Sequence, residues 1–72
     1  MYERTAVEHE RVVETVERWY ADGWPFTIDA VRHRGHTAYG RTATVLREMA
    51  EAGVLERLPD GPRRLAIYRV RT

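Results

Sequence analysis

Apolar residues recur with a helical period in the first part of the chain and predict an amphipathic helix over about residues 3–21. At about 100° of rotation per residue, its apolar stripe consists of Tyr2, Thr5, His9, Val12, Val13, Val16, Trp19 and Tyr20, with Ala6 at the edge. Most glutamates of this segment fall opposite, so we expect the stripe to face the core. The stripe is longer than a three-helix core needs. Its first turns therefore either fray or form a symmetric homodimer contact made of Tyr2, Ala6, His9 and Val13.

Glycine and proline then interrupt the helical pattern. Gly23 ends the segment 21–23, and Pro25 follows two residues later; both residue types disfavour continuation of a helix. Trp24 and Phe26 are therefore expected in an extended segment, where their rings cover the open end of the core. The alternative for Trp24 is stacking on a nucleobase.

A short second helix is predicted over about residues 28–34. Thr27 is expected to be its N-cap, because a threonine hydroxyl accepts a bond from an unpaired amide of the first turn. Asp29 lies in that turn, where a negative charge suits the helix dipole. Ile28 and Val31 are expected to point inward.

The connection after this helix is short and basic. It is expected to bring Arg32, Arg34 and His36 close to the start of the next helix. His33 and His36 are three residues apart, a spacing that suggests a metal site. Without cysteine, only His9 and scattered carboxylates are left to complete such a site, so we expect no metal and interpret the histidines as surface or phosphate-contacting residues.

A third helix is predicted over about residues 38–52, with Thr37 as its N-cap and Gly53 as a left-handed residue that ends it. Its apolar face consists of Tyr39, Thr42, Val45, Leu46 and Met49. The opposite face carries Arg41, Ala43, Thr44, Arg47, Glu48 and Glu51. Small residues on the exposed side, Gly40 among them, would let the backbone approach a flat or grooved partner while two arginines reach past it. The helix alone fits a DNA-reading helix and a solvated helix equally well.

After Gly53 the pattern changes to that of a β-hairpin over about residues 54–70. Two runs rich in branched and aromatic residues are separated by Pro59–Pro62, in which Asp60-Gly61 is a strong turn signal. Ala66, Tyr68 and Val70 share the face that we expect on the core. Arg63 and Arg64 make the tip of the hairpin basic.

Composition limits the classes of function. A chain of 72 residues is one domain, and it contains neither cysteine nor serine, which excludes Ser and Cys nucleophile triads. There is no glycine-rich phosphate loop and no room for a ligand-sensing domain. We therefore expect that the protein is not an enzyme and that it binds neither a cofactor nor a small-molecule ligand. No apolar run has the length of a membrane span or a signal-peptide core, so we expect no membrane contact and a cytoplasmic location.

The charges are distributed unevenly, although the net charge is only +1. Residues 1–29 contain three arginines and seven acids, a net charge of −4, whereas residues 30–72 contain nine arginines and four acids, a net charge of +5. A positive face attracts a phosphate backbone. The split therefore favours a binding role over two merely solvated surfaces.

The succession of helix, short helix, turn, helix and hairpin resembles the winged helix-turn-helix pattern of prokaryotic transcription regulators of the MarR-, ArsR- and PadR-like kinds. The match runs through residues 26–31, Gly35 and a "T-x-x-x-L-x-x-M-x-x-A-G-V-L-x-R" run over residues 42–57. It covers about residues 5–71, and the junction at residues 52–55 is its most specific part. The resemblance implies an α+β, mainly α, fold of three helices followed by a two-stranded wing.

The same resemblance implies binding of double-stranded DNA, with the third helix in the major groove and the wing on the backbone or in the minor groove. Carried over by position, the contacting residues are Arg34, His36, Thr37, Tyr39, Gly40, Arg41, Ala43, Thr44, Arg47, Arg63 and Arg64. Arg41 and Arg47 would bind guanine or phosphate, and Thr44 a base edge or a thymine methyl group. The wing arginines would bind phosphate.

The implied function is that of a small sequence-specific DNA-binding regulator, repressor-like, which acts as a dimer on a palindromic site. Two alternatives stay open at this point. One is a winged-helix adaptor whose acidic first helix docks on a partner protein. The other is an architectural accessory factor in recombination or replication, which would make the same DNA contacts but would not act at a promoter.

Overall fold

Three α-helices and three short strands make up residues 2–72, the part of the chain that the computed structural model describes, with side chains from residue 6 onward. In chain order the elements are α1 (Tyr2–Trp19), β1 (Phe26–Thr27), α2 (Ile28–Gly35), α3 (Tyr39–Glu51), β2 (Leu55–Leu58), a 3₁₀ turn η1 (Pro62–Arg64) and β3 (Ile67–Val70). The expected α+β, mainly helical, class is confirmed, as is the order of the helices and the hairpin. The expected inward positions of Tyr2 and Thr5 lie outside the described side chains, so the dimer contact that includes Tyr2 stays a prediction.

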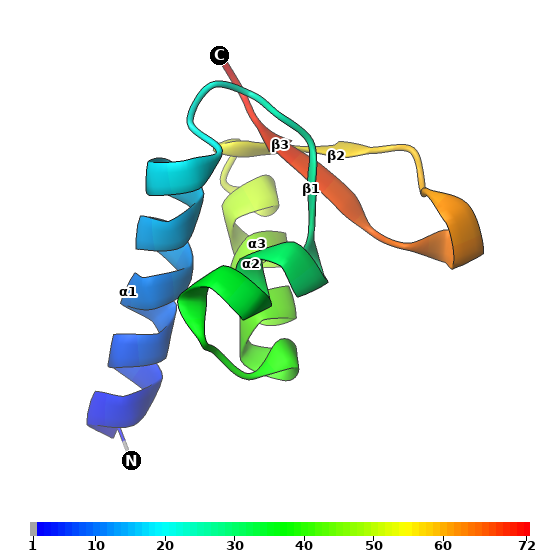
Figure 1. The fold of residues 1–72 in the computed structure, drawn as a ribbon. Helices are drawn as coiled ribbons and strands as arrows, with labels where there is room; N and C mark the ends of the chain where they lie inside the picture. The colour runs from blue at the N-terminus through cyan, green and yellow to red at the C-terminus, as the bar shows by residue number, and fades with distance from the viewer. Residues whose placement is uncertain (1) are drawn as a thin grey trace.

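The three helices pack on one another, and the sheet lies across the ends of α1 and α3 (Figure 1). The β2–β3 hairpin extends away from the helices, with η1 at its far end. Every helix and every strand contributes to one buried core, whereas η1 does not. The core residues are Val12, Val16, Phe26, Val31, Val45, Leu46, Leu55 and Tyr68. The inward placement of the Tyr68 face is therefore confirmed, and the hairpin is fixed to the helices by its base.

The sheet has three antiparallel strands in the order β1-β3-β2, and the expectation of a two-stranded sheet is wrong. β3 pairs on one side with β2, where Arg57 lies opposite Tyr68, and on the other side with β1, where Phe26 lies opposite Tyr68. The segment around Phe26 was expected to be extended, and its pairing with β3 was not predicted. A strand of two residues is too short to show the alternation of apolar and polar residues by which strands are found.

Aromatic packing differs from the expectation at three positions. Phe26 is buried, and its ring stacks 4.6 Å from that of Tyr20 and 6.3 Å from that of Tyr68. Trp24 was expected to cover the core but is 67% exposed, because Phe26 already closes that end. Trp19 and Tyr39 were expected on inward faces and are also about half exposed, at 50% and 53%. Each of the two stands at an end of its helix, beyond the part that packs on the core.

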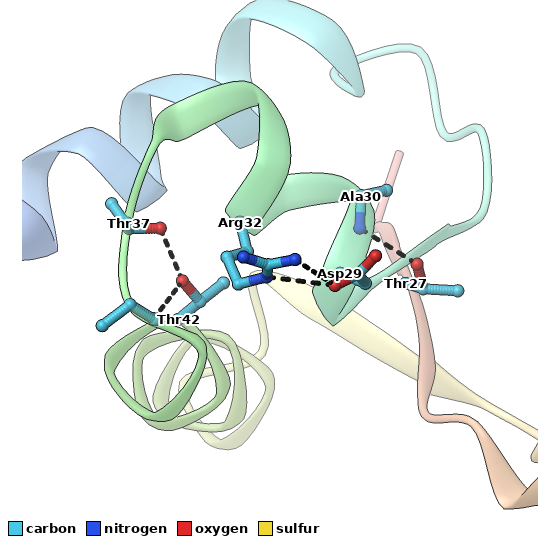
Figure 2. A network of polar contacts seen from close by, with 7 residues as sticks. Thr27, Asp29, Ala30, Arg32, Thr37 and Thr42 are labelled. Atoms are coloured by element: carbon cyan, nitrogen blue, oxygen red, sulfur yellow. Dashed lines mark hydrogen bonds and ion pairs between the residues drawn. The ribbon is translucent and has the colours of Figure 1, made fainter.

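The expected helix ends hold to within two residues. The Thr27 hydroxyl caps α2 by accepting a bond of 3.2 Å from the Ala30 amide (Figure 2), as predicted. Gly53 follows α3 with φ of +84°, also as predicted, and its amide donates to the Ala50 carbonyl while that of Val54 donates to Met49. The last residue of α1 is Trp19, whereas the predicted helix extended to residue 21.

A close approach of α1 and α2 explains the burial of a threonine in α1. A Cβ atom on Gly35 would lie 2.8 Å from Thr15 Oγ1, so only glycine fits without a shift. The Thr15 side chain is 7% exposed, and its hydroxyl donates to the Arg11 carbonyl at 2.6 Å. The sequence pattern placed no polar residue at this contact.

Gly35→Ala is therefore expected to destabilise the domain by about 1–3 kcal/mol, since the buried, hydrogen-bonded Thr15 cannot yield to the new methyl group. In a Thr15→Ala background the methyl group finds space, and the better helix propensity of alanine makes the same change neutral or stabilising. Urea denaturation of the four proteins of this double-mutant cycle measures the coupling. An equal cost of Gly35→Ala in both backgrounds would show that the contact does not set the spacing of the two helices.

Candidate nucleic-acid interface

The start of α3 is held by a pair of threonines. Thr37 was expected to be the N-cap, but the N-cap is Ala38, which makes no side-chain capping bond. The Thr42 hydroxyl donates to the Ala38 carbonyl at 2.8 Å and therefore accepts from the Thr37 hydroxyl, 2.6 Å away (Figure 2). Both threonines are buried, so Thr37 supports the first turn of α3 from the core side and is not exposed to a ligand. Each hydroxyl thus has an acceptor for its proton: Thr42 for the Thr37 hydroxyl, and the Ala38 carbonyl for the Thr42 hydroxyl.

The side chains on the outer side of α3 are short in the first half of the helix. Gly40 is exposed, and a Cβ atom built on it would meet nothing within 4 Å. Ala43 and Thr44 are half-buried, and the Thr44 hydroxyl donates to the Gly40 carbonyl at 3.0 Å. Tyr39, exposed at the first position of the helix, borders this area. The result is a low surface over which another molecule can approach the helix backbone.

Arg41 stands at the edge of this surface with an unsatisfied donor. The residue is half-buried, and its Nε atom is buried without a hydrogen-bond partner among the described residues. A buried donor without a partner costs roughly 1–3 kcal/mol, and more when charged. Because this atom is buried, an acceptor oxygen outside the molecule reaches it only when the Arg41 side chain moves.

The arginines of the described residues fall into those with a carboxylate partner and those without one. Three arginines form ion pairs with carboxylates: Arg32 with Asp29, Arg57 with Asp60 and Arg69 with Glu56. Among residues 6–72, no such pair involves Arg41, Arg47, Arg63 or Arg64. These four side chains are therefore not held by an ion pair within the described part of the molecule, and the same is true of Arg11, Arg18, Arg34 and Arg71. The acids of α3, Glu48 and Glu51, are exposed in its C-terminal half.

The tip of the hairpin is built differently from the expected Asp60-Gly61 turn. Its left-handed residues are Arg63 and Arg64, with φ of 58° and 60°, whereas Gly61 has φ of −80°. The Gly61 amide donates to the Leu65 carbonyl at 2.9 Å and closes a wider loop, so β3 begins only at Ile67. Left-handed conformation costs a non-glycine residue about 1–2 kcal/mol. Both arginines are exposed at this strained tip.

Arg34 and His36 lie apart from the exposed side of α3. They line a cavity of about 320 Å³ together with Arg11, Glu14, Arg18 and Trp19 of α1. The Arg34 guanidinium lies 4.1 Å above the Trp19 ring, and its Nε donates to the Tyr20 hydroxyl at 3.2 Å. The half-exposed Trp19 ring thus contacts the Arg34 guanidinium and does not pack into the core. The prediction did not include Arg11 and Arg18, although their spacing of seven residues puts them on one side of α1.

The chain was compared with protein-family models, curated proteins and solved structures, and none of them matches it. No function can therefore be transferred from a relative. No helix in the described part of the chain is long and apolar enough to cross a membrane. Among the same residues, no three His, Asp or Glu side chains gather closely enough to hold a metal ion. The case for a function therefore depends on the geometry of α3 and the hairpin.

Proposed function

We propose that the chain is a winged helix-turn-helix domain that binds double-stranded DNA, with α3 in the major groove and the β2–β3 hairpin as a wing on the backbone or in the minor groove. The observation that carries this proposal is the pair Arg41 and Arg47. Neither has a carboxylate partner among the described side chains, and they flank a part of α3 that presents only small residues. Two arginines without an ion pair beside short side chains suit a groove about 12 Å wide that is lined by phosphates, and the two glutamates of α3 lie in its C-terminal half.

Each side chain of this surface has a role that follows from its contacts. Arg47 is exposed and reaches a guanine edge or a phosphate. Arg41 forms no ion pair among the described side chains, so its charge is free to attract an oxygen at the edge of the groove. The Thr44 hydroxyl already donates to Gly40, so it meets a base as an acceptor or through its methyl group. This combination supports binding with some sequence preference.

The hairpin supplies a second contact. Arg63 and Arg64 are exposed at a tip that extends from the helices and form no ion pair with any described side chain, which suits them to phosphate (Figure 1). Arg57 is turned to the ring of Tyr68 and to Asp60, and Arg69 to Glu56, so the strands are braced below the tip. A transcriptional regulator is the role we infer; an architectural protein would use the same contacts.

Chemical-shift mapping tests the proposal. The ¹⁵N-labelled chain is titrated at low salt with a short duplex of mixed sequence. Amide shifts are expected to concentrate on Gly40, Ala43, Thr44 and Arg47, with a second group at Gly61 and residues 63–65. The absence of shifts, or shifts confined to the glutamates of α1, would overturn the proposal.

A further inference from the structure

An apolar hollow lies where α1, α3 and the sheet meet, and no expected DNA contact takes part in it. It has a volume of about 530 Å³ and is lined by Val13, Val16, Glu17, Ala21, Met49, Val54 and Val70. Six of these seven residues are apolar. The hollow thus combines residues from both ends of the chain that the sequence pattern assigned to separate elements.

Its apolar lining is open to solvent yet firmly held. Val54 is 48% exposed, while Val13, Met49 and Val70 are half-buried. The backbone of Val54 is bonded on both sides: its amide donates to the Met49 carbonyl at 3.0 Å, and its carbonyl accepts from the Arg71 amide at 3.1 Å. The exposure of this valine is therefore a property of the ordered junction between α3 and β2, and not of a frayed end.

Acidic residues border the hollow along α1. Glu17 lines it directly, and a neighbouring hollow that shares Val13 and Glu17 is lined by Glu10 and Glu14 as well as His9. No ion pair involves Glu10, Glu14 or Glu17 among the described side chains. The apolar floor is thus bounded on one side by carboxylates that form no ion pair among residues 6–72.

We propose that this hollow is a docking groove for a basic amphipathic segment of another protein, whose apolar side chains cover Val54 and Met49 and whose Lys or Arg side chains pair with Glu10 and Glu17. Unpaired acids repel the phosphates of DNA. A second copy packed on this face about a two-fold axis would bring the same glutamates against one another, and like charges at an interface cost affinity. Opposite charge on the partner removes both objections. This inference goes beyond DNA binding and does not depend on it.

The test uses two synthetic helical peptides and the full chain. One peptide is composed of leucine, alanine and arginine; the other has glutamate in place of every arginine. Fluorescence anisotropy of the labelled peptides is expected to show that the arginine peptide binds and the glutamate peptide does not. Val54→Gln should weaken binding about tenfold, since one buried valine side chain contributes roughly that much.

Matched variants distinguish binding in the groove from nonspecific binding of the peptide. Leu65→Gln changes a leucine that is 46% exposed on the hairpin, and it should leave peptide affinity unchanged. Glu10→Arg with Glu17→Arg should abolish preference for the arginine peptide. Because Val54, Glu10 and Glu17 are all exposed, these variants keep the core, and their affinity for DNA should not fall.

Three outcomes would overturn the docking proposal: no binding of the arginine peptide, equal binding of both peptides, or full affinity in Val54→Gln. A dimer of the chain in sedimentation equilibrium that is lost in Val54→Gln would also overturn it, in favour of a second copy. Failure of DNA binding would leave all four readouts unaffected, so the two proposals fail separately.

Discussion

Replacing both Arg41 and Arg47 by alanine is expected to remove most of the affinity for duplex DNA while the fold survives. Each arginine that contacts a base contributes on the order of 1–3 kcal/mol, so together they account for a loss of about thirtyfold to about twenty-thousandfold. Neither side chain forms an ion pair among the described residues, so no internal salt bridge is lost. Anisotropy titrations at one fixed salt concentration measure the loss.

The matched control removes the same net charge elsewhere. Arg18 and Arg71 are exposed, have no ion-pair partner among the described residues, and lie near the C-terminal ends of α1 and of the chain. Arg18→Ala with Arg71→Ala should weaken binding far less than the α3 pair. Equal losses in the two double variants would mean that net charge alone, and not the surface of α3, attracts the DNA.

Leu46→Ala is expected to cost about 2–5 kcal/mol of stability, the largest effect of any single change considered. Leu46 is fully buried in the middle of α3, within a core to which all three helices and all three strands contribute. A domain of this size has only about 3–5 kcal/mol in its core, so a substantial fraction of the variant should be unfolded at room temperature. Urea denaturation followed by circular dichroism measures the change.

The exposed Leu65 is the control for this loss. Leu65→Ala truncates the same side chain at a position that is 46% exposed, and surface changes usually alter stability by less than about 0.5 kcal/mol. Comparable losses at Leu46 and Leu65 would contradict the assignment of the core.

The sequence was sufficient for those parts of the fold that depend on one local signal. Thr27 caps α2 and Gly53 ends α3 as predicted, because capping depends on residues within one turn. The inward face of β3 was predicted correctly from the alternation around Tyr68. The two-residue strand β1 was missed because its existence depends on pairing with a segment about forty positions away in the chain.

The candidate site was predicted only in part, for a similar reason. Spacing on a helix places Gly40, Thr44 and Arg47 on one side of α3 without any knowledge of the rest. Engagement of Arg34 by Trp19 and the role of Thr37 as a support depend on contacts between elements, which a periodic pattern does not contain. The same holds for the apolar hollow, whose lining comes from three separate elements.

Binding of the purified chain to labelled duplex DNA of random sequence, followed by anisotropy over a series of salt concentrations, tests the central claim most directly. For a protein whose arginines neutralise phosphates, the logarithm of the binding constant falls linearly with the logarithm of salt concentration, with a slope of about −0.9 per phosphate. We predict binding at low salt with a slope that corresponds to several phosphates. It should become shallower when Arg63 and Arg64 are replaced by alanine. No binding at low salt, or binding that does not respond to salt, would contradict the assignment of α3 and the hairpin as a DNA-binding surface.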